Sequence, residues 1–344
     1  MSDQSSRGIL YILGFVLAVL AFAAYRFNTW SVSPVQLSEE AIVEFPPGTK
    51  LVDLSGVLES KGVVKQALSF HLWVKAKGVY PKFQAGTYLF KDKVSPNDVI
   101  EAMMKGEVYR PVVLQFTIPE GYNLSLIAQR LAERGLGEAP EILAIMKNPA
   151  TASSLGVPGP TLEGYLYPAT YSYNHEMTLR EVLKDMVGTF FKNLPAEYES
   201  RARKLGLALG EAVTFASLIE LETIHDEERG MISEVIWKRL KNRSPLGIDA
   251  ALIYGIKNYK GDITWNHLKD SKNPYNTRLR KGLPPTPIGS PSAASLEAVL
   301  NPTEKGYYYY VLNGDGQKKH HFSQTLAEHN QHVKVLLKET KNKQ

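Results

Sequence analysis

Two glutamates, Glu220 and Glu222, lie in the otherwise largely apolar segment FASLIELET at residues 215–223. Residues two apart on a helix point about 200° apart, so these two carboxylates cannot share a face. Glu222 continues an apolar arc at helical spacing, formed with Ala212, Phe215, Leu218 and Ile219. Apolar surroundings raise the pKa of a carboxyl, which favours Glu222 as a general acid that protonates a leaving group near neutral pH. A structural alternative stays open, in which Glu222 pairs with a buried arginine such as Arg229.

Composition limits the chemistry that is available. The 344 residues are too many for one ordinary core and favour two or three domains. No cysteine is present, which excludes disulfides, thiolate metal sites and cysteine nucleophiles. His320, His321 and His329 do not follow a zinc-site spacing, so we expect no metal and no cofactor. The net charge of +5 comes from scattered basic residues without an aromatic-interleaved stripe, which argues against a nucleic-acid partner.

The N-terminus carries an uncharged apolar run at residues 8–25. At about 1.5 Å per residue it reaches roughly 27 Å, enough to cross a thin bilayer. A cleaved signal peptide is the alternative, because Ala21-Phe22-Ala23 resembles a cleavage site. We favour a retained single-pass anchor. Residues 1–7 are then a cytoplasmic tail, and the rest of the chain is exported.

A weak internal repeat organises the first half. Residues 45–51 and 118–124 each read as a strand end and a Pro/Gly turn, followed by a short helix that Gly62 or Gly135 closes. Thr49 and Asn123 are the expected helix N-caps. After a linker at 26–40, residues 41–110 therefore predict a small α+β domain that resembles LysM-like carbohydrate-binding modules. Residues 111–177 hold the second strand–helix copy and the connection to the second half of the chain.

The second half, residues 178–344, is predicted to be a mainly helical domain with a small sheet. Apolar periodicity predicts helices over 178–193, 211–223, 227–241, 292–300 and 323–341. The run YYYYVL at 307–312 predicts a strand, because aromatic and β-branched residues favour extended backbone. The fold class expected for the whole chain is α+β.

The segment ASLIELET at 216–223 resembles the corresponding segment of YceG-like (MltG-type) endolytic murein transglycosylases. Further matches to this family occur in order along nearly the whole chain, at residues 83–88, 162–168, 227–229, 237–240, 249–255, 274–277, 282–288, 295–298, 301–302 and 320–330.

The resemblance implies a lysozyme-like lytic transglycosylase domain, a lyase that cuts peptidoglycan glycan strands and leaves 1,6-anhydro-N-acetylmuramic acid ends. It also implies that the second glutamate, Glu222, is the catalytic acid and base, and that peptidoglycan synthases are natural partners. With the N-terminal anchor, it implies a single-pass protein of the bacterial inner membrane whose catalytic domain is periplasmic. Residues expected to bind or support the substrate are Glu163, Glu220, Thr223, Asp249, Tyr254, Tyr275, Asn276 and Thr277. For Glu163 and Asp249, a structural role as turn or cap residues stays open.

Two positions depart from the family pattern: Ala169 stands where Asp is common, and Gly247 stands where Gln is common. Both are expected near the cleft edge, where they affect substrate contacts more than chemistry. Two other functions are kept in view. One is a hydrolysing muramidase, and the other is a membrane-tethered, non-catalytic peptidoglycan-binding protein.

Overall fold

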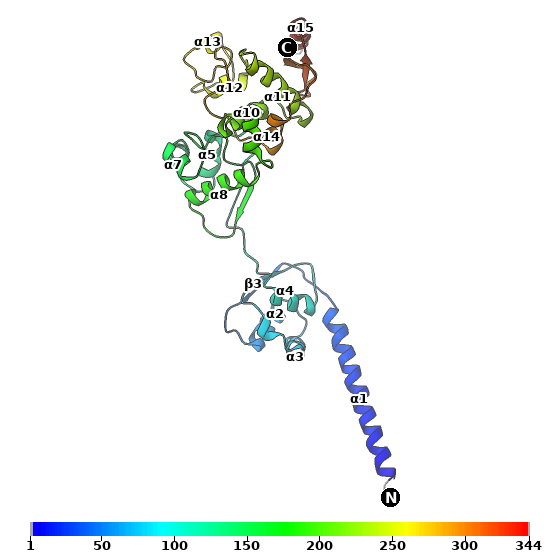
Figure 1. Cartoon of the computed structure of the whole chain (residues 1–344). Helices are drawn as coiled ribbons and strands as arrows, with labels where there is room; N and C mark the ends of the chain where they lie inside the picture. The colour runs from blue at the N-terminus through cyan, green and yellow to red at the C-terminus, as the bar shows by residue number, and fades with distance from the viewer. Residues whose placement is uncertain (1–2, 343–344) are drawn as a thin grey trace. The chain divides into compact units, whose positions relative to one another are not determined.

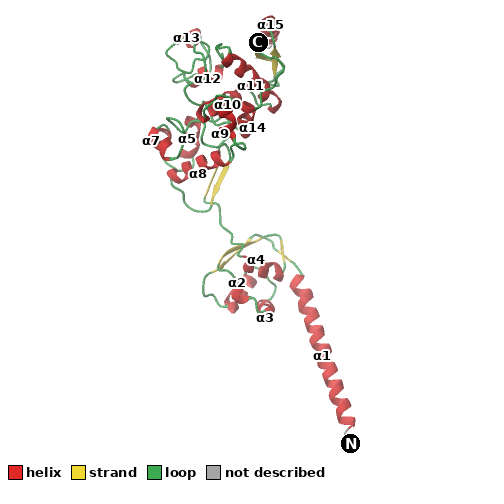
Figure 2. Ribbon diagram, viewed as in Figure 1, coloured by secondary structure: helices red, strands yellow, loops and turns green. Residues whose placement is uncertain are grey.

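The structure is a computed structural model that describes residues 3–342, and its contacts divide the chain into two units after Pro111 (Figure 1). Helices dominate both units, and the named strands pair into two-stranded antiparallel sheets (Figure 2). This mixture of helices and small sheets agrees with the α+β class expected from the sequence.

The N-terminal unit begins with one long helix, α1 (Asp3–Val32). Its segment Leu13–Val32, with a mean hydropathy of 1.3, is long and apolar enough to cross a membrane, a test that signal sequences also pass. The linker expected at 26–40 is partly wrong, since the helix continues through its first seven residues. Phe27 stacks on Trp73 at 6.1 Å between ring centroids, and Trp30 packs against the core of the same unit, so aromatic packing extends the helix.

The rest of this unit wraps short helices around two narrow sheets. Strand β2 alternates buried and exposed residues, so that Ala41, Val43 and Phe45 face the core and pair with β3 from Ala41↔Phe90 to Phe45↔Gly86. The elements are β1 (Val35–Gln36), β2 (Ala41–Phe45), α2 (Leu51–Ser60), α3 (Ala67–Lys77), the 3-10 turn η1 (Tyr80–Lys82), β3 (Gly86–Phe90), β4 (Lys93–Val94) and α4 (Pro96–Lys105).

The C-terminal unit holds the remaining elements around a second core. In chain order they are β5 (Leu114–Thr117), α5 (Leu124–Ala132), α6 (Ala139–Met146), α7 (Pro149–Ser154), β6 (Thr170–Tyr173), α8 (Leu179–Lys192), α9 (Tyr198–Lys204), α10 (Leu209–Glu222), α11 (Asp226–Lys241), α12 (Asp249–Tyr254), α13 (Trp265–Lys269), α14 (Ala293–Leu300), β7 (Tyr309–Leu312), β8 (His320–Ser323) and α15 (Leu326–Asn342). The second strand–helix copy, β5 and α5, belongs to this core.

Helix α10 lies at the centre of the C-terminal unit, in contact with α9, α11, α12 and α14. Every residue from Ala212 to Glu220 is buried, so the helix has no solvent-exposed face over two turns. The helix ends at Glu222 because Thr223 adopts an extended backbone, with φ −145° and ψ 148°. This central position fixes the end of α10 firmly, which matters for the carboxyl that it carries.

Predicted helix boundaries and caps can be compared with the structure. The five helices expected in the second half are confirmed as α8, α10, α11, α14 and α15. Asn123 caps α5 by accepting a hydrogen bond from the Leu126 amide at 3.0 Å. The expected cap at Thr49 is wrong: Lys50 is the N-cap of α2, and the Thr49 hydroxyl donates to the Pro46 carbonyl instead.

Candidate active site

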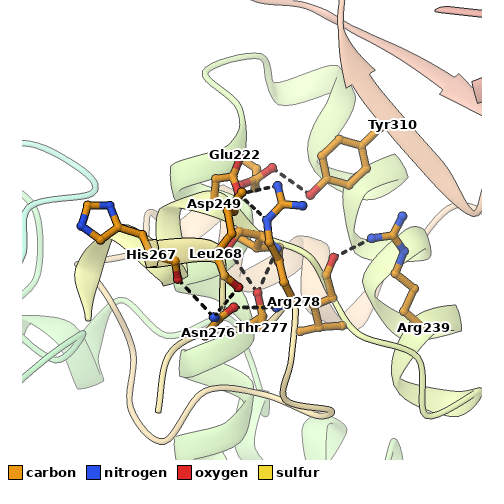
Figure 3. Close-up of polar contacts among 11 residues, drawn as sticks. Glu222, Arg239, Asp249, His267, Leu268, Asn276, Thr277, Arg278 and Tyr310 are labelled. Carbon is orange, nitrogen blue, oxygen red and sulfur yellow. Dashed lines mark hydrogen bonds and ion pairs between the residues drawn. The ribbon is translucent and has the colours of Figure 1, made fainter. Parts of the chain in front are cut away.

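Glu222 is the last residue of α10, and its carboxyl is half-buried beside the hairpin formed by β7 and β8. Its Oε2 accepts a hydrogen bond from the Tyr310 hydroxyl at 2.8 Å (Figure 3). Burial raises the pKa of Glu222 to about 7, against the opposing effect of the Tyr310 hydrogen bond. The nearby charge of Asp249 raises it further, whereas Arg239 and Arg278 lower it. A carboxyl with this pKa can both give and take a proton near neutral pH.

A cleft of about 790 Å³ opens over Glu222. Its wall includes Asp249 at the start of α12, Tyr310 on β7 and Arg239 on α11. The cleft is large enough for a ligand of several rings. Glu222 therefore combines a raised pKa with access to a bound molecule, the two properties that a catalytic acid needs.

Asp249 and Arg278 form an ion pair on the cleft wall. The Arg278 guanidinium donates to Asp249 Oδ1 from Nε at 2.9 Å and from Nη2 at 2.6 Å (Figure 3). Both side chains are partly exposed, so they can exchange some of this pairing for contacts with a ligand.

Asn276 and Thr277, expected as direct substrate contacts, are buried and bond to the backbone instead. Asn276 donates from Nδ2 to the Leu268 carbonyl at 3.1 Å (Figure 3). It also donates to the Asp270 carbonyl at 3.0 Å. The Thr277 hydroxyl accepts from the Ile248 amide at 2.9 Å. These bonds fix the loop that presents Arg278, so the two residues position the cleft wall rather than line it.

Tyr310 is a site residue that the sequence reasoning missed. Its position within four consecutive tyrosines, residues 307–310, gives no signal for which one faces a carboxyl. The strand register decides this, since Tyr310 pairs with Phe322 and alternation turns Tyr309 to the other face. Burial raises the pKa of the Tyr310 phenol well above its usual value, so it stays a hydrogen-bond donor.

Arg239 braces the hairpin that carries Tyr310. It donates from Nε and Nη2 to the Tyr308 carbonyl, at 3.2 and 3.1 Å, and from Nη1 to the Leu246 carbonyl at 2.5 Å. One guanidinium therefore links α11, the base of β7 and the loop before α12. The three elements that surround Glu222 are held together by these bonds.

Glu220 points away from Glu222, as the helical spacing predicted. Its carboxylate lies 3.3 Å from Arg229 Nη1 and accepts a hydrogen bond from the Ser292 amide at 2.7 Å. Both partners of this ion pair are buried. The alternative in which Arg229 pairs with Glu222 is therefore wrong, because Arg229 faces the other side of α10.

Glu163, Tyr254 and Tyr275 form a separate cluster that does not line the cleft. Glu163 accepts hydrogen bonds from the Leu124 amide at 3.2 Å, at the start of α5, and from the Tyr254 hydroxyl at 2.6 Å. Burial raises its pKa to about 7, and these hydrogen bonds oppose the rise. Tyr275 packs edge-on against Tyr254 and shares a hydrogen bond with Thr286. Glu163 thus has the cap role that the sequence left open.

Comparison with known proteins now decides the family. The sequence model of the YceG-like family matches residues 43–335, which is most of the chain. The chain belongs to the YceG-like family. A crystal structure of a YceG-like protein from Listeria monocytogenes is 31% identical, with a TM-score of 0.58 over 85% of this chain and 99% of that one.

Two relatives with assigned names are similar over most of this chain. A protein of Bacillus subtilis named endolytic murein transglycosylase is 28% identical over 89% of this chain and 88% of its own length. A Streptococcus pneumoniae protein of the same name is 29% identical over 94% of this chain. The match spans 65% of the pneumococcal protein, so that relative has sequence beyond the shared part.

The two departures from the YceG-like pattern fall in different places. Gly247 lines the cleft, with a φ of +68° that suits glycine. Ala169 packs against the core and accepts a hydrogen bond from the Ile118 amide through its carbonyl. Of the two, Gly247 is the one that changes the surface seen by a ligand.

Proposed function

We propose that this YceG-like protein is a lytic transglycosylase that cleaves the β-1,4 bond between N-acetylmuramic acid and N-acetylglucosamine in peptidoglycan. The observation that carries the proposal is the Glu222 carboxyl, held at the end of α10 in an open cleft with a pKa of about 7. The names of the Bacillus and pneumococcal relatives support the same substrate.

Glu222 acts twice in the proposed reaction. As acid, it gives its proton to the leaving O4 while the bond from that oxygen to C1 of the muramic acid breaks. As base, it then takes the proton of the C6 hydroxyl, whose oxygen bonds to C1 and closes the 1,6-anhydro ring. No water is consumed, so no second carboxylate is required to activate one. Tyr310 stabilises the carboxylate between the two steps through its 2.8 Å hydrogen bond.

The other site residues take supporting roles in this proposal. Asp249 and its partner Arg278 contact the glycan from the cleft wall. Members of the predicted substrate set that hold elements in place around Glu222 are Glu163, Glu220, Thr223, Tyr254, Tyr275, Asn276 and Thr277.

The N-terminal unit supports a proposal about location. We propose that α1 anchors the protein in the inner membrane, with its N-terminus in the cytoplasm and the chain that follows α1 in the periplasm. The small α+β fold at 41–110 is proposed as a LysM-like glycan-binding module. An endolytic cut made beside the membrane would limit the length of nascent glycan strands. Because peptidoglycan synthases in the same membrane make those strands, they are the proposed partners.

The test is mass spectrometry of the muropeptides that the full-length protein in detergent releases from purified sacculi, beside its Glu222→Gln variant. The expected result is 1,6-anhydro ends from the first protein and none from the variant, because an isosteric amide cannot deliver the proton. Reducing ends would make the protein a hydrolysing muramidase. Release by neither protein, with binding by both, would support the non-catalytic binding function.

A further inference from the structure

A second polar pair, Glu228 and His320, adjoins the proposed catalytic carboxyl. Glu228 lies in the first turn of α11, and His320 begins β8 and forms part of the wall of the Glu222 cleft. His320 Nδ1 lies 2.7 Å from Glu228 Oε2, and the His320 amide donates to Oε1 at 2.8 Å. The Glu228 carboxylate therefore holds His320 through both its imidazole ring and its backbone amide.

The same carboxylate is tied to the residue that comes directly after Glu222. The Thr223 hydroxyl donates to Glu228 Oε2 at 3.0 Å, and the side chain of Glu228 is 4% exposed. The His320 ring also packs edge-on against Tyr310, at 5.3 Å between centroids and 86° between planes. These contacts fix the imidazole relative to Glu222 and to the tyrosine that binds it.

The Glu228 contact determines which ring nitrogen is available. A carboxylate oxygen can only accept, so Nδ1 carries the proton that lies between the two side chains. In the neutral ring, Nε2 is then an acceptor, and it forms no hydrogen bond with the residues that the structure describes. The His320 side chain is only 5% exposed, and it meets the cleft as part of its lining. An oriented acceptor on the wall of a cleft is suited to a hydroxyl group of a bound sugar.

The strand register separates His320 from its neighbour. Pairing of Leu312 with His320 and of Tyr310 with Phe322 places all four side chains on one face of the hairpin. His321 lies on the opposite face, where it stacks on His332 of α15 at 4.5 Å between centroids. The chain thus offers a matched histidine that is outside the cleft lining.

We propose that His320 is a substrate-contacting residue of the Glu222 cleft, whose Nε2 accepts a hydrogen bond from a hydroxyl of the glycan. Glu228 is the positioning residue that orients it. This inference rests on the proposed function, since it takes a glycan as the ligand of the cleft. It adds a second hydrogen-bonded chain to the site. This chain runs from Thr223 through Glu228 to His320, beside the hydrogen bond between Tyr310 and Glu222.

The test uses two substitutions of His320, each of which keeps a polar group near only one of the two ring nitrogens. His320→Asn places an amide nitrogen near the position of Nδ1, which keeps the bond to Glu228 but removes the group at Nε2. His320→Gln places its amide near Nε2 and gives up the bond to Glu228. Each is made in the full-length Glu222→Gln protein, and binding of an alternating N-acetylglucosamine–N-acetylmuramic acid oligosaccharide is measured by calorimetry. His321→Asn in the same protein is the control.

We expect His320→Asn to bind about tenfold more weakly than its parent, the loss of one hydrogen bond in a partly desolvated site. His320→Gln should bind more tightly than His320→Asn although its melting temperature is lower. The control should bind like the parent.

Binding of His320→Asn as tight as that of the parent would overturn the inference, as would equal losses in His320→Asn and the control. Loss of folding in both His320 variants would also overturn it, by showing a structural role. Absence of glycan binding by the Glu222→Gln parent would overturn the proposed function and this inference with it. A failure of the His320 inference alone can therefore be distinguished from a failure of the proposed function.

Discussion

Glu222 and Glu163 occupy two regions of the C-terminal unit, and burial raises the pKa of each to about 7. Each also accepts a hydrogen bond from a tyrosine, Tyr310 in one case and Tyr254 in the other. They differ in what else surrounds them. Both oxygens of Glu163 share the single amide of Leu124 at the start of α5, each at 3.2 Å, and the residue is 1% exposed. Glu222 Oε1 accepts none from the described residues, and the side chain borders an open cleft.

The difference teaches that a raised pKa does not by itself locate a catalytic acid. A buried carboxyl whose oxygens face hydrogen-bond donors of its own chain is not presented to a substrate, even when it holds a proton at neutral pH. A carboxyl with one free oxygen on a cleft can transfer that proton. Access therefore decides between two groups that titrate alike.

The largest expected effect separates the two carboxyls by activity. Glu222→Gln should lower turnover on sacculi by about 10³-fold, within the range of general acid–base catalysis. Glu163→Gln, which keeps an acceptor for the Leu124 amide, should lower turnover by no more than about tenfold. Quantifying released muropeptides for both variants checks this. A loss in Glu163→Gln as deep as that in Glu222→Gln would abolish the distinction.

Tyr310→Phe should lower turnover by about tenfold, because the carboxylate of Glu222 loses a hydrogen bond to a charged group. It should also change the pH dependence. The acid must be protonated in the free enzyme, so kcat/KM falls as pH rises through about 7. Removing a hydrogen bond that favours the ionised form raises the pKa of Glu222, which moves this fall to higher pH. An unchanged profile would show that Tyr310 does not affect the reacting carboxyl.

A further prediction concerns the thermal stability of the unsubstituted protein and of Glu222→Gln at two pH values. The pKa of Glu222 is higher in the folded chain than the ordinary 4.5, so the native state loses stability as pH rises from about 4.5 to 7. Once Glu222 is fully ionised, the free energy of unfolding is lower by about 3 kcal/mol. Glu222→Gln should therefore raise the melting temperature more at pH 8 than at pH 5. Thermal unfolding at both pH values measures it, and a smaller gain at pH 8 would contradict the burial argument.

Asp249→Asn should have the smallest effect on the pH profile, a shift of a few tenths of a unit. The charge of Asp249 raises the pKa of Glu222, so its removal lowers that pKa and moves the alkaline fall of kcat/KM to lower pH. This direction is opposite to that of Tyr310→Phe. Profiles of the two variants measured side by side provide the check, and shifts in the same direction would refute the assigned electrostatics.

Local features of the site were predictable from sequence, and contacts between distant segments were not. The choice of Glu222 over Glu220 follows from helix geometry, which depends on residues a few positions apart. Helices α8, α10, α11, α14 and α15 were predictable for the same reason. Tyr310 lies 88 residues from Glu222, and its role depends on a strand register that four successive tyrosines cannot reveal. Similarly, whether Arg229 would serve Glu220 or Glu222 required the packing of α11 on α10.

The β7–β8 hairpin carries both Tyr310 and His320, and it comes late in the chain. A polypeptide crossing a membrane in order from its N-terminus presents Glu222 long before these two partners. A chain cut before Tyr309 would keep the carboxyl but would lack the hydroxyl that binds it. If the chain is exported as proposed, the hydroxyl that binds the Glu222 carboxyl crosses the membrane 88 residues after that carboxyl, so the two meet only once the β7–β8 hairpin has followed α10 across.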